Sequence, residues 1–208
     1  MTVSRKQRLT RQEQKARTRQ QILASGERVF RRNGFHKATV EMITADAGYT
    51  KGAFYANFSS KEDLFFILLA PRLEARGRAI GKLVESEEIY DDASEAAHRL
   101  ITYMADDPDW QRAFLEFLVR LSIDARFGAR LQEVRQPICQ ALAHLAQMRW
   151  GLSPTEANVV ATTVWVVSIG SAMEALQSGP EAASTALQLA LQSLLNHLSR
   201  PEQGAERR

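Results

Sequence analysis

Hydrogen-bonding residues gather in one short stretch of this chain, residues 39–58, which reads TVEMITADAGYTKGAFYANF. Hydroxyl, ammonium and amide groups are suited to contacts with phosphate oxygens and with the edges of bases. If Phe54 and Phe58, four residues apart, point inward, the residues left outside are rich in donors and free of carboxylates. These outer residues are Tyr49, Thr50, Lys51, Gly52, Tyr55 and Asn57. A face of this composition is suited to DNA.

Two short helices joined by a tight turn are expected to position this face. Thr39 can cap the first helix through its hydroxyl, and Gly48 can end it in the left-handed conformation that glycine adopts most easily. Thr50 can then cap a second helix that begins at Lys51. Spacings of three and four place three apolar residues on the buried face of the first helix: Val40, Ile43 and Ala47.

Charge is divided unevenly along the chain. Residues 1–61 contain 13 Lys and Arg against 4 Asp and Glu, a net charge of +9, whereas residues 62–208 contain 14 against 20, a net charge of −6. A charged surface is most often only a solvated one. Here the positive excess coincides with the helix-turn-helix pattern, so it favours a polyanion as the partner of the N-terminal part.

Composition argues against several other classes of protein. The single cysteine, Cys139, has no partner for a disulfide or a zinc site, which is typical of a cytoplasmic protein. The first ten residues contain no apolar segment of the kind found in signal peptides. The most apolar stretch, 159–173, is shorter than the roughly 20 residues that span a bilayer, so we expect a buried helix and no membrane partner.

Catalytic and metal sites are not indicated. The histidines lack ligand-type spacing, and no glycine-rich phosphate loop or recognisable nucleophile is present, so we expect no metal, no cofactor and no enzyme activity. The four histidines are His36, His98, His144 and His197.

The pattern along the chain predicts an all-α protein of two domains. We expect a basic flexible arm at 1–17, a helix-turn-helix domain at 18–64, a larger helical domain at 65–200 and a flexible tail at 201–208. Within the first domain a helix from about Thr18 is expected to end at Gly34. A fourth helix should open at Ser59 with a capping box to Glu62 and run to about Val84, with a kink or break at Pro71.

The C-terminal part predicts further helices over about 93–105, from Pro108 onward, over about 128–150 and from Pro154 to about Gln177, followed by a last one. Stripes on the last two helices could form a four-helix seam with a second copy, and we favour this arrangement. The alternative is that both stripes pack inside one chain. They consist of Ala161, Trp165, Ser168 and Ala172, and of Leu187, Leu191, Leu194 and Leu198.

The segment GFHKATVEMITADAGYTKGAFYANFSSKEDLF, residues 34–65, resembles the DNA-binding domain of TetR-family transcriptional regulators. This resemblance implies an N-terminal three-helix DNA-binding domain. It also implies a larger helical domain that binds a small-molecule effector and forms a homodimer through its last two long helices. The implied function is that of a ligand-responsive repressor, which binds a palindromic double-stranded operator and is released by a small, largely apolar effector.

The resemblance also implies roles for single residues. Thr39, Tyr55 and Lys61 correspond to phosphate contacts, and residues 49–52 to the start of the recognition helix, where base edges are reached. Ala56 and Asn57 depart from the pattern of the family. An effector pocket is implied among the middle helices, although aromatic residues at helical spacing are also typical of plain core. Its candidate lining residues are Met104, Trp110, Phe114, Phe117 and Trp165.

Two alternatives stay open at this point. One is an enzyme that carries a helix-turn-helix, and the other is a DNA-architectural or recruiting protein that senses no ligand. The size of the C-terminal domain favours a sensor. If the protein is a sensor, the fourth helix is the expected lever between the domains, because it joins both.

Overall fold

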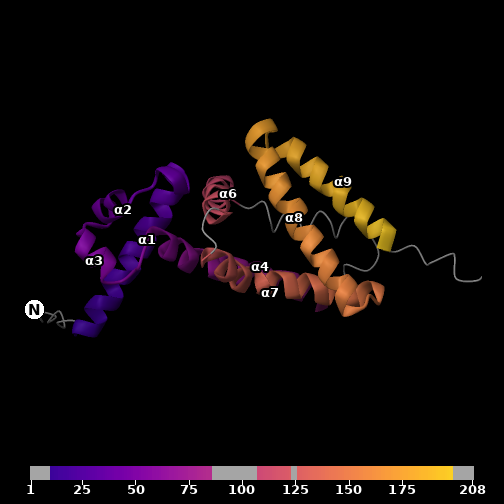
Figure 1. Ribbon diagram of the computed structural model, residues 1–208, viewed down its shortest axis with the longest axis horizontal. Coiled ribbons are helices and arrows are strands. Elements are labelled where there is room, and N and C mark those ends of the chain that lie inside the picture. Colours follow the sequence, from indigo (N-terminus) through magenta and orange to yellow (C-terminus); the bar gives the residue numbers. More distant parts are fainter. Residues whose placement is uncertain (1–9, 86–106, 123–125, 199–208) are drawn as a thin grey trace, which may run out of the picture.

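The computed structural model describes residues 10–85, 107–122 and 126–198 of the chain, and within these ranges the regular structure is all helical (Figure 1). The predicted all-α fold is therefore confirmed. The expected helix over 93–105, the first nine residues and the expected tail lie outside the described residues. The helices are α1 Arg11–Lys37, α2 Val40–Ala47, α3 Lys51–Tyr55, α4 Lys61–Glu85, α6 Pro108–Ser122, α7 Arg126–Trp150, α8 Pro154–Ser178 and α9 Pro180–Leu198.

The first helix begins earlier than the sequence pattern indicated. Thr10 caps it, with its hydroxyl accepting a hydrogen bond from the Glu13 amide at 3.2 Å, while the Glu13 carboxylate accepts one from the Thr10 amide at 2.7 Å. This reciprocal capping box starts the helix at Arg11. The predicted start at Thr18 was wrong, and residues 11–17 are helical, not part of a flexible arm.

The residues predicted to cap the two helices of the helix-turn-helix do so in the structure. Thr39 accepts from the Met42 amide at 3.2 Å, and Thr50 accepts from the Ala53 amide at 3.3 Å. Gly48 takes a left-handed conformation with φ of 71° and ends α2. The buried hydroxyl of Ser25 in α1 donates to the Ile43 carbonyl at 2.7 Å, which fixes α2 against α1.

The fourth helix starts with a different pair of residues from the one expected. The Ser60 hydroxyl accepts from the Asp63 amide at 3.0 Å, and the Asp63 carboxylate accepts from the Ser59 amide at 3.1 Å. The predicted box from Ser59 to Glu62 was therefore one residue too early. The helix is unbroken at Pro71, and the bend expected there stays a prediction.

In the C-terminal part, α6, α7, α8 and α9 lie close to their predicted positions. The start of α8 was predicted from the sequence SPTE, and the capping box is confirmed. The Ser153 hydroxyl accepts from the Glu156 amide at 3.4 Å, and the Glu156 carboxylate accepts from the Ser153 amide at 2.8 Å. Long α4 and α7 run side by side, and α8 and α9 pair at the far end (Figure 1).

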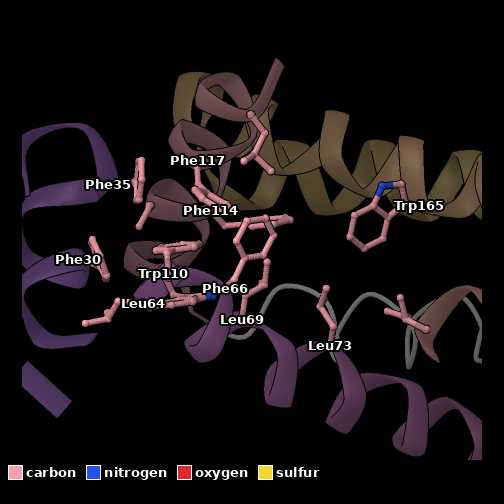
Figure 2. Packing of buried hydrophobic residues seen from close by; sticks show 14 of the residues in the cluster. Phe30, Phe35, Leu64, Phe66, Leu69, Leu73, Trp110, Phe114, Phe117 and Trp165 are labelled. Atoms are coloured by element: carbon pink, nitrogen blue, oxygen red, sulfur yellow. The ribbon is translucent and has the colours of Figure 1, made fainter. Parts of the chain in front are cut away.

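An aromatic cluster joins the two parts of the chain through α1, α4 and α6 (Figure 2). Phe117 of α6 lies 4.9 Å from Phe35 and 4.4 Å from Phe65, measured between ring centroids. Trp110 stacks on Phe65 at 4.8 Å with nearly parallel planes. Since these rings are all buried, the DNA-binding part and α6 share one continuous core.

The predicted apolar stripe of α8 turned out to face the inside of the chain. Ala161, Trp165, Ser168 and Ala172 are all buried within one copy, and so is Leu187 of α9. Leu194 packs partly buried against the same core, while the side chains of Leu191 and Leu198 lie outside the described residues. The assignment of the α8 stripe to a seam between two copies was therefore wrong.

A second stripe of α8 is exposed instead. Val159, Val166 and Met173, at intervals of seven residues, are 61%, 59% and 49% exposed. By length and composition alone α8 could also cross a membrane, and it is the single helix within the described residues that passes this test.

Candidate nucleic-acid interface

Five of the eight predicted DNA-contacting residues are exposed on the two motif helices or their caps. They are Thr39, Thr50, Lys51, Gly52 and Tyr55. Tyr55 stands out because its large side chain is 58% exposed, although Phe54 beside it is fully buried. A phenol held out in solvent on a helix is well placed to donate to a phosphate oxygen.

Gly52 is notable for the space around it. Its backbone has no positive φ, and a Cβ added there would meet nothing closer than the Thr50 hydroxyl at 3.7 Å. Neither the backbone conformation nor the packing of the protein therefore requires glycine. A glycine on an exposed helical surface allows another molecule to approach the backbone closely.

Tyr49 and Asn57 are turned toward the protein, although both were predicted on the outer face. The Tyr49 hydroxyl donates to the Gln21 side chain at 2.5 Å and so ties the turn to α1. The Asn57 side-chain amide donates to the Ala53 carbonyl at 2.8 Å, and Arg19 of α1 donates to the main-chain carbonyl of Asn57 at 2.6 Å. The Tyr49 side chain and the main chain of Asn57 thus hold the motif against α1, and contact of Tyr49 and Asn57 with DNA stays a prediction.

Lys61 also has partners inside the protein. Its ammonium donates to the carbonyls of Phe35 and Ala38, each at 2.8 Å, and lies 4.3 Å from the centre of the Phe35 ring. Burial lowers the pKa of this half-buried group. Lys61 thereby fastens the segment that leads into Thr39, the cap of α2.

Glu41 lies on the same face, and the sequence analysis missed it. Its carboxylate forms an ion pair with the Lys51 ammonium. The hydrogen bond from Lys51 within this ion pair is the main reason that the pKa of Glu41 falls to about 2. The same bond raises the pKa of Lys51. The prediction of a carboxylate-free face was wrong, because the turn brings the start of α2 beside the start of α3.

Further cations lie near the motif. Arg28 of α1 binds Asp46 of α2 at 2.5 Å, and this hydrogen bond is the main cause of the lowered pKa of Asp46. Arg11, Lys15 and Arg17 are exposed on the first turns of α1. Across the described part of the chain, no group of three or more His, Cys, Asp and Glu side chains could hold a metal ion.

Polar contacts from the C-terminal part reach the second half of α1, which leads into the motif. The Glu116 carboxylate of α6 accepts a hydrogen bond from the His36 amide at 2.7 Å. Arg31 binds Asp107 at 2.5 Å, and Arg72 of α4 binds Glu27 at 2.7 Å. These contacts link α1, which leads into the motif, to α4 and to the start and middle of α6.

The predicted effector-lining residues divide into two groups. Trp110 and Phe117 lie in the aromatic cluster beside the DNA-binding part. Phe114 and Trp165 contact each other between α6 and α8, at 6.3 Å between ring centroids and edge to face, and Figure 2 shows Trp165 farther from Phe30 and Phe35 than Phe114 is. Met104 lies outside the described residues. The role of the described four as ligand contacts stays a prediction.

Comparison with known proteins gives a consistent picture. The profile of bacterial regulatory proteins of the tetR family matches residues 22–67. The HTH-type transcriptional repressor AcnR of Corynebacterium diphtheriae is 30% identical over 138 residues, which cover 63% of this chain and 68% of AcnR. The uncharacterised regulator YwcC of Bacillus subtilis is 36% identical over 83 residues, 36% of this chain and 37% of YwcC.

The chain thus spans only part of the relatives that match it in sequence, including 47% of the regulator YfiR of Bacillus subtilis. Solved structures match over more of its length. A transcriptional regulator from Rhodococcus sp. RHA1 has a TM-score of 0.67 at 20% identity, covering 88% of this chain and 99% of that one. The regulator FadR of Bacillus subtilis, solved with stearoyl-CoA, has a TM-score of 0.62 at 19% identity, covering 84% and 97%.

Proposed function

Because this chain belongs to the TetR family of bacterial transcriptional regulators, we propose that it is a ligand-responsive repressor that binds a palindromic operator as a homodimer. The protein is a DNA-binding regulator and not an enzyme. The observation that carries the proposal is the exposed face of the motif. There Thr50, Lys51, Gly52 and Tyr55 stand clear of the core at the basic end of the chain. We place its action in the cytoplasm, where the operator is.

We assign contacts with base edges to the N-terminal end of α3, and contacts with phosphates to exposed residues on either side of it. Thr50 and Lys51 are short or flexible donors at the start of the recognition helix, where base edges of the major groove are reached. Thr39 and Tyr55 are exposed hydroxyls on either side, suited to phosphate oxygens. In this arrangement Tyr49, Asn57 and Lys61 act on DNA through the positions that they give to these residues.

The exposed stripe of α8 supports the homodimer. Val159, Val166 and Met173 form one apolar line along α8, the helix that pairs with α9. Leu176 of α8 and Leu189 of α9 are also exposed. An apolar line of this kind is stabilised when a second copy covers it. An open groove lined by Leu152, Val159 and Leu194 continues the line. We therefore place the dimer on α8 and α9, with this stripe at its centre.

The effector is proposed to contact Phe114 and Trp165. These rings come from α6 and α8, and they meet where the core that contains Trp110 and Phe117 extends toward α8. Solved relatives of this fold hold ligands as different as stearoyl-CoA and choline, so the lining of each protein selects its ligand. The two proposed contacts of this chain are aromatic, which favours a largely apolar molecule.

A ligand between α6 and α8 has a short route to the DNA-binding face. Phe114 and Glu116 lie on the same helix, and Glu116 holds the His36 amide ahead of α2. A ligand that shifts α6 changes how this segment is held, and α4 is joined to the same segment through Lys61. Release of the operator requires that the ligand bind one spacing of the two motifs better than the other.

The function can be tested by selecting sequences from a random duplex library with the purified protein. We expect an inverted repeat whose half-sites are about one helical turn apart, centre to centre, and a complex that contains an even number of chains by light scattering. Selection of no consensus, or of a single half-site bound by one chain, would contradict the proposal. The oligomer is checked with Val166→Glu, which should give monomers that lose operator affinity.

The ligand response is tested by thermal shift with apolar metabolites and drugs, followed by operator binding. A compound that raises Tm and weakens operator binding supports a sensor. Its effect should fall in a Trp165→Ala variant that still binds the operator. If no compound changes either measurement, the proposal of a ligand sensor loses its support.

Lys61→Met is expected to lower the free energy of unfolding by about 1.5–3 kcal/mol, because it removes charge-assisted hydrogen bonds to two carbonyls. Operator affinity should fall, but the slope of log affinity against log salt should not change, because the ammonium is held by the protein and not by phosphate. Urea denaturation and salt titrations measure the two quantities. A slope shallower by about one per motif would show instead that Lys61 contacts a phosphate.

A further inference from the structure

The DNA-binding face contains a negative charge placed against one of its own cations. Glu41, in the first turn of α2, and Lys51, the first residue of α3, are each 57% exposed and form an ion pair across the turn. Thr39, the cap of α2, lies two residues before Glu41, and its side chain also lowers the pKa of Glu41. The carboxylate thus binds one residue to which a DNA contact is assigned and lies close in sequence to another.

A carboxylate at this place opposes phosphate. Any phosphate oxygen that approaches Thr39 or Lys51 meets the charge of Glu41, and like charges in contact are unfavourable. A phosphate must also compete with Glu41 for the Lys51 ammonium. DNA binding without sequence preference depends almost entirely on phosphate contacts, so this form of binding is the one that the ion pair weakens most.

We propose that Glu41 is a specificity-determining residue, which holds Lys51 toward base edges and weakens DNA binding that depends on phosphate alone. The proposal rests on the proposed DNA-binding function. Specific complexes gain contacts from base edges that offset the repulsion, and complexes with other sequences do not. Discrimination is therefore raised by an unfavourable interaction with the wrong DNA as well as by favourable ones with the operator.

The test compares the wild type with Glu41→Gln on two duplexes of equal length, the operator selected by the wild type and a scrambled sequence. We expect Glu41→Gln to bind the scrambled duplex about tenfold more tightly at low salt, with a salt slope steeper by about 0.9 per motif, as one freed lysine takes a phosphate. Operator affinity should rise less, so that the ratio of specific to non-specific affinity falls.

Two further variants separate this mechanism from a general effect of charge. Glu74→Gln removes the same charge from a similarly exposed ion pair, with Arg78 on α4, and should leave both affinities unchanged. In a Lys51→Met background, Glu41→Gln should increase scrambled-duplex affinity by much less than tenfold, because the cation that it frees is absent. The double variant thus tests whether Glu41 acts through Lys51.

Three outcomes would overturn the proposal. They are unchanged scrambled-duplex affinity in Glu41→Gln, an equal gain in Glu74→Gln, and a loss of operator affinity alone, which would mean that Glu41 reads a base directly. Failure of the proposed function looks different, since the wild type would then select no DNA sequence at all. A wild type that selects an operator while Glu41→Gln behaves identically rejects only the inference about Glu41.

Discussion

Gly34→Ala is expected to lower the free energy of unfolding by about 2–4 kcal/mol, through backbone strain and loss of a charge-assisted hydrogen bond. Gly34 has φ of 74° and ψ of 173°, a region that other residues almost never adopt. A Cβ at this position would lie 2.5 Å from a carboxylate oxygen of Glu116. The carboxylate would have to move away and would lose the His36 amide. Urea denaturation followed by circular dichroism measures the change.

Gly48→Ala is the matched control for this prediction. Gly48 also has a positive φ, but its conformation is ordinary left-handed helix, and a Cβ there meets nothing within 4 Å. We expect a smaller loss of about 1 kcal/mol. If the two variants were equally stable, the approach of Glu116 to Gly34 would have no energetic importance.

Gly34→Ala should also weaken operator binding more than its stability loss alone accounts for. The segment after Gly34 leads to Thr39, and Glu116 and Lys61 hold it from two other helices. Displacing Glu116 releases one of these holds. Operator affinity measured well below the unfolding transition, where the variant is folded, separates this effect from simple unfolding.

Gly52→Ala is expected to act in opposite directions on folding and on DNA binding. Alanine is favoured over glycine in a helix by up to about 1 kcal/mol, and nothing in the protein obstructs the added methyl group. In the proposed complex with DNA, the added methyl group would lie in the close contact between α3 and the operator. Overpacking of this contact by about 1–3 kcal/mol corresponds to an affinity loss of about 5- to 150-fold. Thermal unfolding and operator titration measure the two effects.

Gly81→Ala is the control for this pair of effects. Gly81 lies within α4, where a Cβ also meets nothing within 4 Å, so a similar gain in stability is expected with unchanged operator affinity. Unchanged affinity in Gly52→Ala would show that DNA does not approach this part of α3. A loss of stability would mean that the turn itself requires glycine.

Much of the fold could be predicted because its signals are local. The caps Thr39, Thr50 and Ser153 each accept from an amide three residues away, and Gly48 ends a helix through its own backbone. Interactions of this range are encoded in neighbouring residues. The start of α1 is also encoded locally, in the capping box of Thr10 and Glu13. The prediction was wrong there because the positive charge of residues 1–17 was interpreted as a flexible arm.

The parts of the site that could not be predicted depend on residues distant in sequence. Tyr49 reaches Gln21, Lys61 reaches the carbonyls of residues 35 and 38, and Glu41 meets Lys51 across the turn. Helical periodicity places each residue on a face of its own helix, but it does not specify which neighbour that face meets. Side chains predicted on the outer face could therefore be recruited by the core, and a carboxylate could join the DNA-binding face.

The last two helices show this division most clearly. The existence, the start and the apolar character of α8 can be predicted from its own residues, because capping and hydropathy are properties of the segment. The helix contains two apolar stripes, one with Ala161 and Trp165 and the other with Val159 and Val166. Which stripe is buried depends on the packing of the whole chain, because burial is set by the faces that α6, α7 and α9 present to α8.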